Sequence, residues 1–411
     1  MGGFLLVPAL ALVLLSGFLT AGCHHEVAIT PPRASKDGTA QHDEQAQSVL
    51  DALVRAIRQD DRQAAMTLGA PASRERLGQV AENAAALRID DLSLRYVDDG
   101  AALGAEQQSG LGPDAWQGTV QLTYRYRGYD TTPASMETSA VFVPSSDGAR
   151  IASFGSATER SPLWLVDRLS VVRTPDSLLA VAGGSPGRYT GLVARALRQV
   201  RHVLPTWRGP LLVEVPRTRA QLNAVLQSAP GEYDNIAAVT TTADGSLAPG
   251  APVRVFVNPS VFGRLKERGA QVVMSHEATH VATGATFTSM PTWLLEGFAD
   301  FVALDGAGVP VQVAAGQILS RIRKGGLPRG LPTSQALDPT ANGLGATYEE
   351  AWLACRFLAQ RYGTDALVRF YRRVSGGTPT RAAFRSVLGT TQADFVTAWR
   401  ADLSRLARVA R

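Results

Sequence analysis

Two histidines four residues apart are the part of this sequence best suited to chemistry. Residues 276–280 spell HExxH, and positions i and i+4 of a helix share one face, about 6 Å apart. His276 and His280 can therefore hold one metal ion between their imidazoles, with Glu277 beside it and free to act. The residues before the motif are apolar, which favours a buried helix, and Gly284 is placed to end it.

A zinc site in a hydrolase needs three protein ligands and an open fourth position. The metzincin pattern would place Gly at position 283 and His at 286, but both positions hold Thr, so that class is excluded. Glu296 begins a second apolar helix that should end near Leu304, and it is the best third ligand. One turn further, Asp300 lies on the same face and can accept the free ring N–H of a ligating histidine.

Both motifs together resemble a known family. The sequence HEATH followed by WLLEGFAD is similar to the gluzincin zinc metallopeptidases of the peptidase MA-like group, whose hallmark is HExxH and then W-L-x-E-G-x-A. The resemblance covers about residues 186–411. It implies one zinc ion per chain, held by His276, His280 and Glu296, with Glu277 as general base. Fifteen residues separate His280 from Glu296, fewer than in the thermolysin and aminopeptidase branches, so the subfamily stays open.

The same resemblance suggests a partner for the oxyanion. In this fold a tyrosine from a helix downstream of the third ligand often donates to that oxygen, and Tyr348 opens such a helical pattern here. The alternative is a buried tyrosine that packs beside Trp352.

The N-terminus carries an export signal. Residues 4–19 are mostly apolar and end in Leu19-Thr20-Ala21-Gly22-Cys23, which resembles a bacterial lipoprotein signal. That resemblance implies cleavage after residue 22 and lipid attachment at Cys23. No Lys or Arg precedes the apolar run, so a plain cleaved secretory signal or an uncleaved anchor are the alternatives. Residues 23–44 are expected to form the lipidated terminus and a flexible tether.

Composition favours a globular protein with a large core, since 45% of residues are hydrophobic and 19% charged. The net charge of +5 comes from dispersed arginines, and no aromatic-basic pattern indicates nucleic-acid binding. Cys355, the cysteine other than Cys23, falls in an apolar helical pattern and is expected in the core.

The chain is predicted to be an α+β protein with two domains after the leader. Residues 45–182 should form helices followed by an antiparallel sheet, a layout that vaguely resembles the NTF2-like fold. Strands are expected at 87–97, 116–126, 140–143, 151–154 and 164–173. The glycine-rich segment 181–187 marks the boundary, and 186–411 should form the peptidase-like domain with a small sheet and a largely helical C-terminal half. A strand at 253–257 precedes the motif helix, either at the edge of the sheet, where it would bind an extended peptide, or inside it.

These features lead to an expected function and location. The chain should be a zinc-dependent metallopeptidase, tethered by lipid on the extracytoplasmic face of a bacterial membrane and acting on a peptide or protein of the cell envelope. The alternative is a non-catalytic envelope lipoprotein, a scaffold or ligand-binding module on a peptidase-like fold. The substrate, endo- versus exo-cleavage, the role of the first domain and the oligomeric state are left open by the sequence.

Overall fold

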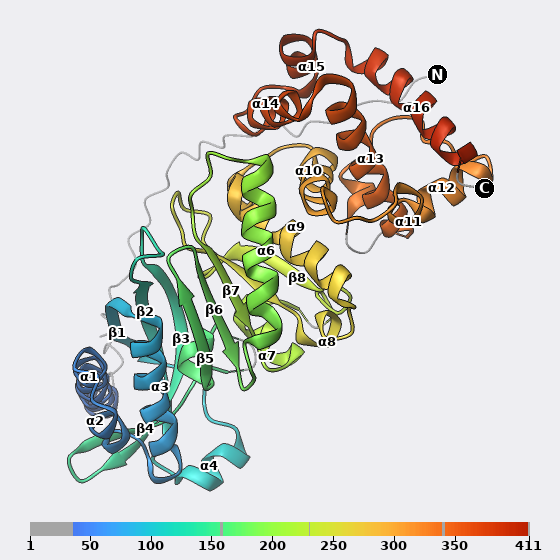
Figure 1. Ribbon diagram of the computed structural model, residues 1–411. Coiled ribbons are helices and arrows are strands. Elements are labelled where there is room, and N and C mark those ends of the chain that lie inside the picture. The colour runs from blue at the N-terminus through green and yellow to red at the C-terminus, as the bar shows by residue number, and fades with distance from the viewer. Residues whose placement is uncertain (1–35, 157–158, 230, 339–341, 410–411) are drawn as a thin grey trace, which may run out of the picture.

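A computed structural model describes residues 36–156, 159–229, 231–338 and 342–409. Three parts follow one another in space as they do in the chain: an N-terminal unit, a central sheet with its helices, and a C-terminal group of helices (Figure 1). Cys23 and the leader lie outside the described residues. Within the described ranges, no helix is both long and apolar enough to cross a membrane.

The N-terminal unit packs helices against a four-stranded antiparallel sheet in the order β1-β2-β3-β4. Strand β2 buries every second residue, because alternate side chains point to opposite faces and only one face meets the core. The predicted α+β layout is confirmed, while the finer NTF2-like resemblance stays a prediction. The elements are α1 (Lys36–Arg58), α2 (Arg62–Thr67), the 3-10 helix η1 (Pro71–Ser73), α3 (Arg74–Leu87), β1 (Ile89–Asp99), α4 (Ala105–Leu111), β2 (Trp116–Tyr126), β3 (Ala134–Ser145) and β4 (Gly148–Phe154).

The central sheet has five strands in the order β5-β6-β7-β9-β8. The pairs β6–β7 and β7–β9 are parallel, whereas β5 and β8 run antiparallel to their neighbours at the two edges. Its elements are α5 (Leu163–Val166), β5 (Leu169–Thr174), β6 (Ser177–Ala182), α6 (Gly187–Val203), β7 (Leu211–Val215), α7 (Arg219–Leu226), β8 (Ala238–Thr242), β9 (Val253–Val257) and α8 (Pro259–Phe262).

Three sequence predictions are wrong in detail. The segment 164–173 is not one strand, since α5 comes first and β5 follows. Strands β5 and β6 were assigned to the first domain, up to residue 182, but they pair within the central sheet. Helix α1 begins at Lys36, so residues 36–44 are helical and do not form a flexible tether.

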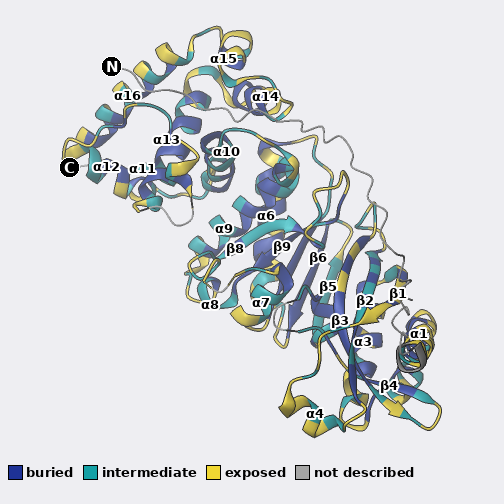
Figure 2. Ribbon diagram, turned by 180° about the vertical axis from the view of Figure 1, so that it is seen from behind, coloured by how far each residue is buried: buried dark blue, intermediate teal, exposed yellow. Residues whose placement is uncertain are grey.

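Both faces of the central sheet are covered, which explains why β6 and β7 are buried along their whole length (Figure 2). On β6, Leu179 and Val181 join the core under α6 and α9, while Leu178 and Ala180 join the core of the N-terminal unit. The N-terminal unit is therefore packed onto the sheet that carries the candidate site.

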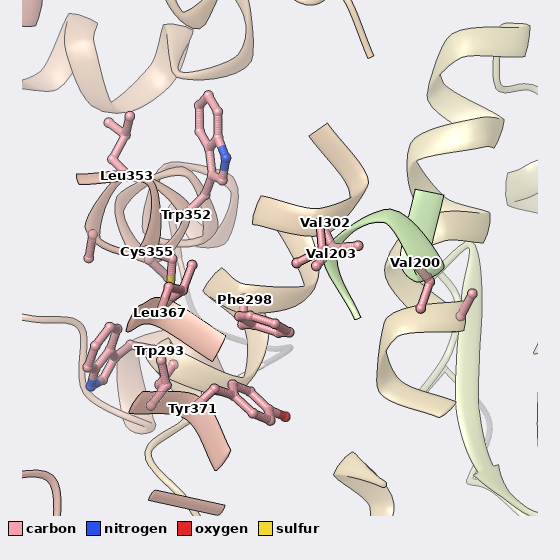
Figure 3. Packing of buried hydrophobic residues seen from close by; sticks show 14 of the residues in the cluster. Val200, Val203, Trp293, Phe298, Val302, Trp352, Leu353, Cys355, Leu367 and Tyr371 are labelled. Carbon is pink, nitrogen blue, oxygen red and sulfur yellow. The ribbon is translucent and has the colours of Figure 1, made fainter. Parts of the chain in front are cut away.

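The C-terminal part is helical, as predicted. Helix α10 packs against α13, and Figure 3 shows Trp293 and Phe298 among side chains of α13 and α14, including Cys355, Leu367 and Tyr371. Cys355 is buried, as expected for a core residue. The remaining elements are α9 (Glu267–Thr283), η2 (Ala285–Phe287), α10 (Thr292–Leu304), α11 (Val311–Ala314), α12 (Gly316–Arg323), η3 (Gln335–Leu337), α13 (Leu344–Tyr362), α14 (Thr364–Ser375), α15 (Thr380–Leu388) and α16 (Gln392–Val409).

Candidate metal centre

Helices α9 and α10 bring the two motifs together. Helix α9 carries HExxH and ends at Gly284, whose left-handed backbone (φ 64°) lets its N–H bond back to the last turn, as the sequence predicted. Helix α10 carries Glu296 and Asp300 and packs directly against α9. The face of α9 that bears His276 and His280 therefore meets the face of α10 that bears the two carboxylates.

Three donor atoms converge between these helices. Nε2 of His276 lies 3.0 Å from Nε2 of His280 and 3.1 Å from Oε2 of Glu296, and the distance from His280 to Glu296 is 3.5 Å. Zinc binds nitrogen and carboxylate oxygen at about 2.0–2.2 Å, so tetrahedral ligand atoms should lie about 3.3 Å apart. The observed spacings match that value. His276, His280 and Glu296 form a group that fits a zinc ion.

Asp300 lies where the sequence placed it. Its Oδ1 is 2.7 Å from Nδ1 of His276, which leaves Nε2 of that ring directed at the other two ligands. Such a carboxylate fixes the tautomer and orientation of a metal-binding histidine. His280 differs, because its Nδ1 is buried and has no hydrogen-bond partner among the described residues.

The charges around the group favour a cation. Burial alone would lower the pKa of His276, but Asp300 and Glu296 raise this pKa well above its ordinary value. Burial would raise the pKa of Glu296, but hydrogen bonds with His276 and His280 lower it far below the usual range. The two carboxylates thus favour positive charge at this point, and a metal ion would supply it while both rings stay neutral with one N–H each.

Glu277 is buried beside the ligands and is held by one side chain. Its Oε2 accepts a hydrogen bond of 2.6 Å from the hydroxyl of Thr240 on β8. Burial raises the pKa of Glu277, which suits a group that must accept and return a proton. The sequence analysis missed Thr240. The β-branched run 240–242 is a strand signal, but nothing in it indicates contact with a residue 37 positions away.

A cleft of about 410 Å³ opens over the group. It is lined by the three ligands, Glu277, Tyr348 and strand β8, together with apolar side chains including Ile236, Leu295 and Leu344. Tyr348 is half-buried in this cleft, and its hydroxyl has no hydrogen-bond partner within the described ranges. Strand β9, considered as a possible edge strand, is interior, and the strand that borders the cleft at the sheet edge is β8.

Gly297 explains how Tyr348 reaches the site. A Cβ at this position would lie 2.4 Å from the carbonyl oxygen of Ala351, so only glycine allows α10 and α13 to approach so closely. Because α13 begins with the turn that carries Tyr348, this close contact brings that side chain beside Glu296. The glycine belongs to the predicted motif, but its packing role appears only in the structure.

Comparison with known proteins finds distant structural similarity. No protein-family model and no curated protein matches the chain. Two solved structures of the M1 zinc metallopeptidase from Deinococcus radiodurans are similar to it. One is a mutant bound to a Tyr-Ser-Ala substrate, with 14% identity and a TM-score of 0.36, covering 75% of this chain and 60% of that one. The other has 14% identity and a TM-score of 0.35, covering 77% and 61%. This chain therefore spans about three fifths of the length of those chains.

Proposed function

We propose that this protein is a zinc-dependent metallopeptidase. The observation that carries the proposal is the group of three donor atoms 3.0–3.5 Å apart, with the buried Glu277 carboxylate next to it in an open cleft. A site that only stored or sensed a metal would need no general base. The cleft also leaves room for a fourth ligand and a substrate.

Each residue of the candidate site has a separate role in the proposed reaction. Zinc, when bound, polarises the scissile carbonyl and lowers the pKa of a water molecule to about 7. Glu277 takes a proton from that water and returns it to the leaving amine. The hydrogen bond from Thr240 keeps the carboxylate of Glu277 in one orientation while this happens. Asp300 holds His276 in the ligating tautomer throughout.

Strand β8 is suited to bind an extended peptide. It pairs on one side with β9 and forms the edge of the sheet on the other, where it borders the cleft. Main-chain groups at such an edge can pair with a substrate strand whatever its side chains. The apolar lining of the cleft favours apolar side chains next to the cleaved bond.

Tyr348 is proposed to donate to the carbonyl oxygen as negative charge develops on it. Its hydroxyl lines the cleft and makes no other hydrogen bond with described residues, so it is available to the substrate. Loss of an oxyanion donor costs about 10²- to 10³-fold in kcat, and Tyr348→Phe should show a loss of that size. A normal kcat for Tyr348→Phe in steady-state peptide hydrolysis would show that Tyr348 only packs in the cleft.

The proposal is tested by measuring zinc binding and peptide hydrolysis separately. Purified protein should contain about one zinc per chain by elemental analysis and should hydrolyse a peptide library. Glu296→Ala should lose most of the zinc, whereas Glu277→Gln should keep the zinc and lose the hydrolysis. Absence of zinc after reconstitution would reject the proposal and favour the non-catalytic lipoprotein. Unchanged hydrolysis in Glu277→Gln would reject the role of that residue.

The location of the enzyme is a separate proposal, supported by the N-terminal sequence alone. A lipid on Cys23 would hold the protein at the extracytoplasmic face of a bacterial membrane, near peptide or protein substrates of the envelope. Cys23→Ser should then release the protein from the membrane fraction. Continued tight association would indicate an uncleaved anchor.

A further inference from the structure

A second cavity lies at the other end of helix α9. Its volume is about 770 Å³, larger than the cleft over the metal ligands, and the two share no lining residue. It is lined by one face of α6, by the first turns of α9 and by the segment that follows α10. The cavity is therefore separate from the candidate metal centre, although helix α9 borders both.

The walls of this cavity carry unpaired positive charge. Of its two carboxylates, Glu267 is paired with Arg195 at 3.0 Å, whereas Asp305 lies 3.9 Å from His202, and the lining holds three arginines against these two carboxylates. Two further arginines line it, Arg198 and Arg268, and neither makes a hydrogen bond or an ion pair with any described residue.

The floor of the cavity, by contrast, is fixed by a chain of hydrogen bonds. Arg195 donates to Gln271 (2.7 Å), Gln271 donates to Ser275 (3.0 Å), and Ser275 donates to Gln199 (2.7 Å). Gln199 in turn donates to two main-chain carbonyls at the end of α10, at 2.9 and 2.7 Å. The floor thus joins α6, α9 and α10 and has its polar groups paired. A ligand would meet a preformed surface whose lining includes the two free guanidinium groups.

We infer that this cavity binds a phosphate-bearing ligand. A guanidinium group stays charged at all ordinary pH values and presents N–H donors in a fork that matches phosphate oxygens. The excess positive charge of the lining suits a phosphate ester, which carries one or two negative charges. The volume suits an organic molecule better than a lone ion, since ligand pockets commonly measure about 300–1,000 Å³. The ligand is either a free phosphoester or the headgroup of an anionic lipid.

This inference is independent of the metal and of peptidase activity. Ser275, beneath the lining residues, directly precedes His276, so the hydrogen-bond chain and the proposed metal ligands share helix α9 but no lining residue. Binding itself is measurable on protein from which any metal has been removed. Failure of the proposed peptidase function would therefore leave the binding experiment intact.

The experiment measures binding to purified protein by calorimetry, with glycerol phosphate as the probe and inorganic phosphate as competitor. A second arm measures co-sedimentation with vesicles of phosphatidylglycerol and, for comparison, of phosphatidylcholine. The double substitution Arg198→Gln with Arg268→Gln removes both free charges. The matched control, Arg381→Gln with Arg385→Gln, removes the same charge from exposed, unpaired arginines of α15.

The cavity variant should weaken binding roughly tenfold or more, because each charge-assisted hydrogen bond is among the stronger kinds. Both arginines are exposed, so the variant should fold, and its Tm checks this. The pair Arg198→Lys with Arg268→Lys should keep part of the affinity.

The two arms distinguish the sources of the phosphate. Saturable glycerol phosphate binding that is lost in the cavity variant and kept in the control would support a soluble ligand. Binding to phosphatidylglycerol vesicles alone, lost in the same way, would support a lipid headgroup. If neither probe binds, or if the cavity and control variants behave alike, the proposal is overturned.

Discussion

Asp300→Asn should weaken zinc binding while leaving all three ligands in place. The hydrogen bond from His276 to Asp300 is 2.7 Å long, the length of a bond to an ionised group. Both side chains are mostly buried, with 14% and 18% of their side-chain surface exposed, so water screens the pair only weakly. Loss of a carboxylate that orients a ligating histidine typically costs 10- to 100-fold in metal affinity or activity.

The upper part of that range is expected here. His280 has no partner for its Nδ1 among the described residues, so His276 is the ring that a side-chain hydrogen bond holds in orientation. Asparagine keeps the size of the side chain but removes its charge, and its oxygen is a weaker acceptor. We therefore expect the zinc dissociation constant to rise by roughly 30- to 100-fold.

The assay is a competition titration against a chromophoric chelator at pH 7, with Asp305→Asn as the control. Asp305 follows the same helix but lies beyond the ligands, 3.9 Å from the exposed His202. Its substitution should leave zinc affinity unchanged. If Asp300→Asn binds zinc as tightly as the parent does, the carboxylate does not orient the ligand and the reasoning is refuted.

Three further predictions concern other contacts. Thr240→Val removes the hydrogen bond to Glu277 and should lower kcat at least roughly tenfold with little change in KM, because a misplaced catalytic group slows the reaction. Thr240→Ser keeps the hydroxyl and should keep kcat. Equal kinetics in the two variants would refute the positioning role. Arg254→Met should destabilise the fold by about 3–5 kcal/mol in urea unfolding, because the fully buried Arg254 pairs with Asp130, in the loop after β2, and with Glu214 on the neighbouring strand β7. A loss below about 1 kcal/mol would contradict this. Burial raises the pKa of Glu214 in the folded protein above its pKa in the unfolded chain. The contribution of Glu214 to the free energy of unfolding is therefore fully present below the unfolded pKa and is lost as the pH rises through the folded pKa. Glu214→Gln should abolish that loss, as unfolding measured across pH would show.

Local sequence patterns correctly predicted the helices and strands whose conformation depends on residues nearby in the sequence. Strand β2 was predicted with its observed bounds, because strict alternation of apolar and polar residues reflects a sheet with one buried face. The segment 164–173 was misassigned, since a short buried apolar run has no period that separates helix from strand. Residues 169–182, which form β5 and β6, were assigned to the first domain because the choice of a strand's partner depends on residues far along the chain.

The candidate site shows the same division. The sequence by itself predicted His276 and His280 as ligands and Glu277 as base, because helical spacing alone brings the two histidines to one face of a helix. It also predicted Glu296 and Asp300, one helical turn apart. Only the tertiary structure decided that β8 forms the edge of the cleft, that Thr240 donates a hydrogen bond to Glu277, and that Gly297 lets α13 pack closely against α10. The same holds for the cavity with Arg198 and Arg268, which lie on different helices. These contacts join segments that are far apart in the sequence and are brought together by packing of the whole core. The spacing of residues within one segment carries no information about such contacts.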